Sequence, residues 1–215
     1  MVPSTTVMMS IGTLVISFLA GFLFAYAMSN ESKKEKKKQL ENLLSYLINF
    51  IIFIWVGKIV LYIDVFIQDP LAILAYPSNA GAFYIATLLI AVNILFHIVR
   101  KKLSGKALLH VFVPVFLAAS FLFELIQFIL FDIRQAWVPL TLLAILLIVY
   151  IFTIEKVPKT LASLIFLISW MIGQLVLSMS NVHSTIFGYA ISPYYFIGLL
   201  ILVLLGIVYS NKRKV

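Results

Sequence analysis

Residues 108–131 read LLHVFVPVFLAASFLFELIQFILF, a nearly unbroken apolar run. An α-helix rises about 1.5 Å per residue, so about 20 apolar residues cross the hydrocarbon core of a bilayer. The run therefore predicts a transmembrane helix. Its one acidic residue is Glu124, and a carboxylate at membrane depth is costly unless it is paired, protonated or functional.

The composition of the whole chain fits a membrane protein. Of 215 residues, 63% are apolar and only 11% are charged, which no ordinary soluble domain matches. Comparable apolar runs recur along the sequence, and they predict seven spans at 7–28, 44–67, 82–99, 108–131, 136–154, 160–180 and 193–210. The expected fold is an all-α integral membrane protein with a single seven-helix transmembrane domain.

The basic residues are concentrated in alternate connectors. Fourteen of the sixteen lysines and arginines lie in SKKEKKK, RKKLSGK, EKVPK and NKRKV, whereas the opposite connectors contain Arg134 alone. By the positive-inside rule the N-terminus is expected outside and the C-terminus in the cytoplasm. The net charge of +8 then mostly reflects membrane topology and does not indicate nucleic-acid binding. A lysine run beside the membrane also attracts anionic lipid headgroups.

The predicted outer connectors are 68–81, 131–137 and 180–193. Two prolines interrupt the first connector, which leaves 71–76 as a short interfacial or re-entrant segment. The third connector carries His183, which is interpreted as a loop histidine. The chain has no cysteine, no convincing set of metal ligands, no cofactor motif and no enzyme signature such as Gly-x-Ser-x-Gly.

Polar side chains from four predicted spans fall in the outer half of the membrane. They are Lys58, Tyr84, Glu124, Gln127 and Gln174. Three interpretations stay open. Lys58 and Glu124 could form a structural ion pair supported by the glutamines, or the set could line a polar pocket for a lipid headgroup or substrate, or it could relay protons or ions.

Several short pieces of sequence occur in a recognisable order. They are Ile11-Gly12, Glu41-Asn42-Leu43-Leu44, Gly57-Lys58-Ile59, DPLAIL at 69–74, PSNAGAFY, the RKK after the third span, Val113-Pro114 and ISPYYFIGLLILVLLGIVY. In this order and topology the chain resembles the prolipoprotein diacylglyceryl transferase family over about residues 11–210. That family moves a diacylglyceryl group from phosphatidylglycerol to a cysteine thiol of a lipoprotein precursor at the outer face of the membrane.

The chain departs from this family at the matching catalytic positions. Glu124 stands where the family has its signature arginine, and Gln127 where it has an asparagine. Tyr84 replaces a histidine and Gln174 a second arginine, so only Lys58 is kept in kind. Since a carboxylate repels the phosphate of the lipid, the resemblance implies a catalytically degenerate member.

The expected function is therefore binding without the usual reaction. The ligand would be a phospholipid, first of all phosphatidylglycerol, or a lipoprotein precursor or another membrane protein. Lys58, Glu124, Gln127 and Gln174 would bind it in the bacterial cytoplasmic membrane, in lipoprotein or envelope biogenesis. One alternative is an active glyceryl or acyl transferase with Glu124, Lys58 and Tyr84 as catalytic candidates. The other is a small ion-coupled transporter that uses Lys58 and Glu124.

Overall fold

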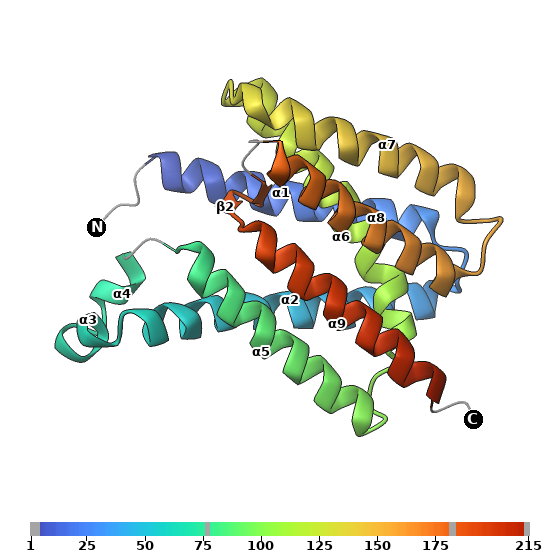
Figure 1. Ribbon diagram of the computed structural model, residues 1–215, viewed down its shortest axis with the longest axis horizontal. Coiled ribbons are helices and arrows are strands. Elements are labelled where there is room, and N and C mark those ends of the chain that lie inside the picture. The colour runs from blue at the N-terminus through green and yellow to red at the C-terminus, as the bar shows by residue number, and fades with distance from the viewer. Residues whose placement is uncertain (1–4, 76–77, 181–183, 213–215) are drawn as a thin grey trace. The chain divides into compact units, whose positions relative to one another are not determined.

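The computed structural model describes residues 5–75, 78–180 and 184–212, and these residues are almost entirely helical (Figure 1). The helices are α1 (Thr5–Met28), α2 (Lys33–Leu61), α3 (Ile63–Gln68), α4 (Ala72–Ala75), α5 (Ala80–Val99), α6 (Gly105–Leu130), α7 (Trp137–Thr153), α8 (Lys159–Met179) and α9 (Pro193–Lys212). A short 3-10 helix, η1 (Arg134–Ala136), precedes α7. Two strands, β1 (Thr185–Ile186) and β2 (Tyr189–Ala190), form an antiparallel hairpin between α8 and α9.

Six stretches of the described chain are helical, long and apolar enough to cross a membrane, and they follow the first six predicted spans. They are α1, α2, α5, α6, η1 with α7, and α8. This agrees with the expected all-α membrane fold. The apolar part of α9 that is described, Pro193–Ile207, is shorter, so the seventh span and the orientation of the chain stay predictions.

α2 begins well before the predicted span because the lysine run is helical. Ser32 caps the helix, since its side-chain oxygen accepts a hydrogen bond from the backbone N–H of Glu35 at 3.3 Å. At its other end α2 stops at Leu61, with Tyr62 as its C-cap, and the short helices α3 and α4 follow. Within the predicted segment 71–76, α4 covers Ala72–Ala75.

The chain divides into two compact units, which are described separately. Unit 1 comprises Met1–Met28 and Val113–Val215, and unit 2 comprises Ser29–Phe112. In unit 2, α2 and α5 pack closely where Gly57 faces Ala82. A Cβ atom added at Gly57 would lie 2.8 Å from the carbonyl oxygen of Ala82. Small residues of this kind allow helices to approach within a membrane.

In unit 1, α1 crosses α6 in the same way. A Cβ atom added at Gly21 would lie 2.5 Å from the carbonyl oxygen of Val115. Aromatic rings join the later helices, because Trp170 of α8 packs 4.6 Å from Phe116 of α6 and 5.7 Å from Phe196 of α9, measured between ring centroids.

The predicted connector 180–193 contains a β-hairpin, which the sequence analysis did not predict. Its turn residues Phe187 and Gly188 have φ angles of 49° and 85°, as a two-residue type I′ turn requires. The ring of Phe187 lies 4.9 Å from that of Phe18, 5.5 Å from Phe123 and 6.0 Å from Phe116.

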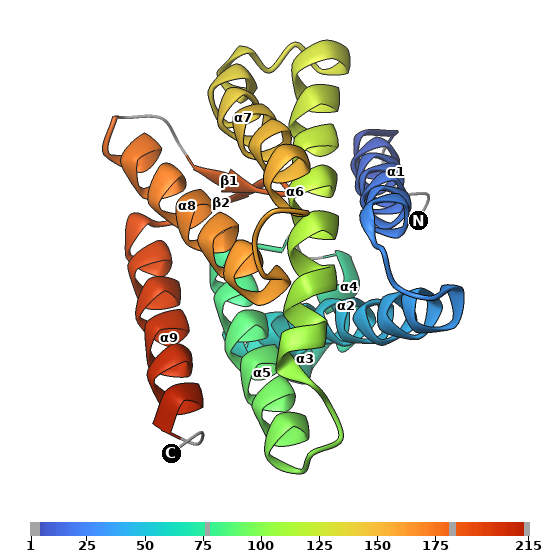
Figure 2. The ribbon, with the colours of Figure 1, turned by 90° about the vertical axis from the view of Figure 1, so that its right-hand side faces the viewer.

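Phe116 is near the middle of α6, so the hairpin reaches deep among the helices of unit 1 (Figure 2). Such backbone is tolerated at membrane depth where protein buries it or where it lines a polar cavity. Residues 181–183, including His183, lie outside the described chain.

Candidate functional site

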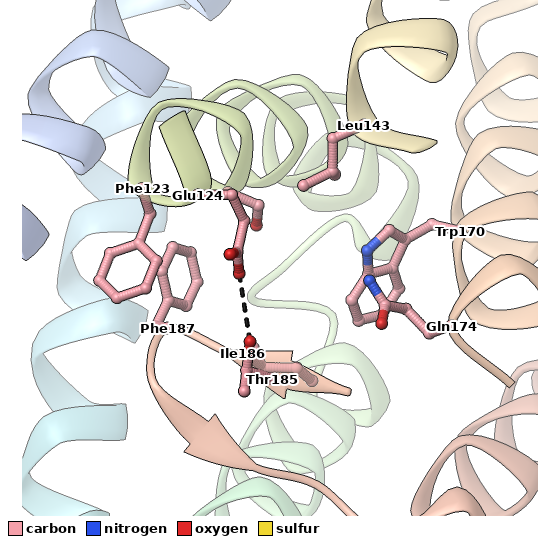
Figure 3. Close-up of a pocket in the computed structure, with 9 residues that line it drawn as sticks. Phe123, Glu124, Leu143, Trp170, Gln174, Thr185, Ile186 and Phe187 are labelled. Atoms are coloured by element: carbon pink, nitrogen blue, oxygen red, sulfur yellow. Dashed lines mark hydrogen bonds between the residues drawn. The ribbon is translucent and has the colours of Figure 1, made fainter. Parts of the chain in front are cut away.

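A small cavity in unit 1 lies where α6, α7, α8 and the hairpin meet (Figure 3). It is lined by Ser120, Phe123, Glu124, Leu143, Trp170, Gln174, Thr185, Ile186 and Phe187. The space open to the centre of a water molecule is about 10 Å³, which is close to what a single water needs.

Glu124 is the charged group of this cavity. It lies six residues before the end of α6, about 9 Å along the helix axis, and its side chain is only 5% exposed. The hydroxyl of Thr185 donates a hydrogen bond to Glu124 Oε1 at 3.3 Å. None of the nine described lining residues is basic, so these residues supply no cation to neutralise the carboxylate.

Two further polar side chains face the same space from α8. Trp170 and Gln174 are one helical turn apart, and both are almost completely buried, at 4% and 1% exposure. Trp170 Nε1 and Gln174 Oε1 have no hydrogen-bond partner among the described residues. One water could accept from Trp170 and donate to Gln174, so the cavity has both the size and the polarity for a bound water.

Hydroxyl groups fasten the hairpin to α8 beside the cavity. The side chain of Ser184 donates to the backbone carbonyl of Gln174 at 3.0 Å, and that of Ser178 donates to the same carbonyl at 2.8 Å. The two serine hydroxyls lie 2.6 Å apart. The hairpin is thus held to α8 by its serine and to α6 by its threonine.

Replacing Thr185 with valine is expected to destabilise unit 1 by about 1–3 kcal/mol, because a buried acceptor on Glu124 loses its donor. Valine keeps the shape of threonine and suits a strand, so packing is preserved. The free energy of unfolding in detergent measures the effect. Thr141→Val is the matched control, since the Thr141 hydroxyl is exposed and donates to the carbonyl of Trp137 in its own helix. An equal loss in both variants would contradict a special role for the Thr185 contact.

The structure brings together two of the five predicted polar residues. Glu124 and Gln174 line one cavity, whereas Gln127 is half-buried on α6 and is not among the lining residues. Lys58 is buried, with 6% exposure, but it belongs to unit 2, as does Tyr84. A Lys58–Glu124 ion pair would join the two units and stays a prediction.

Sequence reasoning missed the partners of Glu124 on the hairpin and the indole of Trp170. A signal for the hairpin was present, because TIFGYA places β-formers on both sides of a Phe-Gly pair. Trp170 could have been noted from its spacing, one helical turn before Gln174. Nothing in the sequence indicated that the hairpin would return among the helices.

The His, Asp and Glu side chains are the potential metal ligands of this chain. In the described parts of the chain, no three His, Cys, Asp or Glu side chains cluster as metal ligands. His97 instead lies against Tyr46, with ring centroids 6.1 Å apart, and its Nδ1 is 2.9 Å from the carbonyl oxygen of Asn93.

Comparison with known proteins gives no relative. No protein-family model, no curated protein and no solved structure matches this chain. The resemblance to the diacylglyceryl transferases therefore rests on the sequence pieces quoted above and stays a prediction.

Proposed function

We propose that the chain is a multi-pass membrane protein whose function depends on proton uptake and release at Glu124, as in a small ion-coupled transporter. The observation that carries this proposal is the enclosure of Glu124 in a cavity for one water, beside two polar atoms that have no hydrogen-bond partner among the described residues. An ionisable residue inside a membrane helix indicates a functional site by default, because its burial is costly.

The surroundings of Glu124 support exchange of a proton. The neutral acid is the less costly form in an apolar site, and a water in the cavity would give it a partner for transfer. The hydroxyls of Ser178 and Ser184 extend the row of polar groups from Gln174 towards the end of α8. A re-entrant hairpin also fits a transport protein, where non-helical backbone lines the site.

Proton flux into reconstituted vesicles tests the proposal. Vesicles with a pH-sensitive dye inside and an imposed membrane potential are expected to acidify faster with the protein than without it. Glu124→Gln should return the rate to that of protein-free vesicles, because glutamine cannot exchange a proton. Glu155→Gln, which changes an exposed residue of unit 1, should leave the rate unchanged. Equal flux with the wild type and Glu124→Gln would contradict the proposal.

Phospholipid binding by a degenerate transferase is the second candidate. A cavity for one water is too small for a glycerol phosphate headgroup. However, three of its nine lining residues belong to the hairpin, so withdrawal of the hairpin would enlarge it. This candidate follows from the family resemblance. Its ligand is phosphatidylglycerol, and its setting is lipoprotein biogenesis in a bacterial membrane.

Two assays distinguish this second candidate. Purified protein should retain phosphatidylglycerol that Glu124→Leu loses, and it should not transfer diacylglycerol to a lipobox peptide beside an authentic transferase. Retention unchanged in Glu124→Leu would contradict binding at this site. Transfer that depends on Glu124 would instead establish an active enzyme with an altered catalytic set.

The expected orientation is part of the proposal. Since the chain has no cysteine, single cysteines at Lys34 and Arg134 can be labelled without background. An impermeant maleimide added to intact cells should react at Arg134→Cys and not at Lys34→Cys. The reverse pattern would invert the proposed topology.

A further inference from the structure

The basic residues of unit 2 gather at one end, apart from Lys58. Tyr46 of α2 and His97 of α5 are in ring contact, and the beginning of α2 and the end of α5 lie on the same side of this unit (Figure 1). This end has nine basic and three acidic residues, an excess of six positive charges. The basic ones form two groups: the α2 patch (Lys33, Lys34, Lys36, Lys37, Lys38) and the α5–α6 patch (Arg100, Lys101, Lys102, Lys106).

The backbone of the α5–α6 patch is fixed by a helix-ending motif. The N–H of Lys101 donates to the carbonyl of Ile98, and the N–H of Lys102 donates to that of His97, both at 3.0 Å. This is the Schellman arrangement, in which the first residue after the cap adopts a left-handed conformation. Lys101 has a φ of 55°, where glycine is favoured, so its position is held at some cost in backbone energy.

The side chains of this patch lie directly beside exposed apolar surface. The guanidinium carbon of Arg100 is 4.0 Å from the centroid of the Phe96 ring, which is a cation–π contact. Phe96 is 50% exposed, and Leu95 and Val99 of the last turns of α5 are 58% and 55% exposed. The α5–α6 patch therefore adjoins the exposed apolar surface of the last turns of α5.

We propose that the α5–α6 patch binds the phosphate of an anionic phospholipid, with the acyl chains along the last turns of α5. Arginine and lysine form charge-assisted hydrogen bonds with phosphate oxygens, and basic clusters beside membrane helices attract anionic headgroups. The adjoining apolar surface favours a lipid over a soluble anion. The inference rests on the apolar helices crossing a bilayer and is independent of the proton chemistry proposed for Glu124.

Lipid retention measured by native mass spectrometry tests this inference. The protein is taken from an equimolar mixture of phosphatidylglycerol and phosphatidylcholine, and the affinity for each lipid is determined. Lys101→Gln with Lys102→Gln should weaken phosphatidylglycerol binding about tenfold and leave phosphatidylcholine binding unchanged. The matched control is Lys33→Gln with Lys34→Gln, which removes the same charge from the α2 patch, a long way along the helix from its first buried residue, Leu43. This control should retain most of the binding.

Two further measurements keep the result interpretable. Lys101→Gly removes one charge at a position where glycine suits the backbone, so it should fold and still bind more weakly than the wild type. Inorganic phosphate at constant ionic strength should not displace the lipid. Equal losses in the two double variants, unchanged binding in Lys101→Gly, or displacement by inorganic phosphate would overturn the assignment.

Discussion

Replacing Gly21 with alanine is expected to destabilise unit 1 by about 1–3 kcal/mol. The added Cβ would lie 2.5 Å from the carbonyl oxygen of Val115 and 3.1 Å from the Cβ of Ala119. Since the obstacle is backbone, α1 must move away from α6, which breaks packing along the whole crossing. The free energy of unfolding in detergent, followed by loss of helical circular dichroism, measures the effect.

Gly12→Ala is the matched control on the same helix. A Cβ atom at Gly12 would meet no described residue within 4 Å, so this variant should be neutral or slightly more stable. A Gly21→Ala protein as stable as Gly12→Ala would mean that α1 and α6 do not approach as closely as described.

Trp170→Ala is expected to have a still larger effect, about 3–5 kcal/mol. The indole is 4% exposed and packs edge-on against Phe116 and Phe196, so its loss leaves a cavity between α6, α8 and α9. The same variant removes one wall of the Glu124 cavity. Thermal unfolding followed by circular dichroism should show a clearly lowered midpoint.

Trp55→Ala provides the comparison for the same change of side chain. Trp55 is 56% exposed on α2, and its replacement should cost less than 1 kcal/mol. If the two alanine variants unfold at the same temperature, the packing described around Trp170 is wrong.

The sequence predicts the helices well because the bilayer imposes their length. Apolar runs such as 82–99 and 160–180 coincide with α5 and α8 to within a few residues. The exception is α2, which begins at Lys33. Hydropathy detects only the apolar part of a helix, whereas a cap such as Ser32 sets where the helix starts.

The candidate site is predicted only in part. Glu124 and Gln174 stand out because polar groups in apolar helices are rare, and they do line the same cavity. Thr185 could not be placed from the sequence, because a hydroxyl in a connector is ordinary until the hairpin folds back among the helices. The pairing of Lys58 with Glu124 depends on long-range helix arrangement, which helix periodicity does not determine.

Detecting protonation of the Glu124 carboxyl is the most direct test of the central claim, which is that Glu124 exchanges a proton in this cavity. Infrared difference spectra between acidic and alkaline buffer should be recorded for the wild type and for Glu124→Gln. We expect a protonated-carboxyl C=O band in the wild type that changes with pH, is absent in Glu124→Gln, and is shifted in Thr185→Val through loss of the hydrogen bond. Wild-type and Glu124→Gln spectra with the same pH-dependent bands would contradict it.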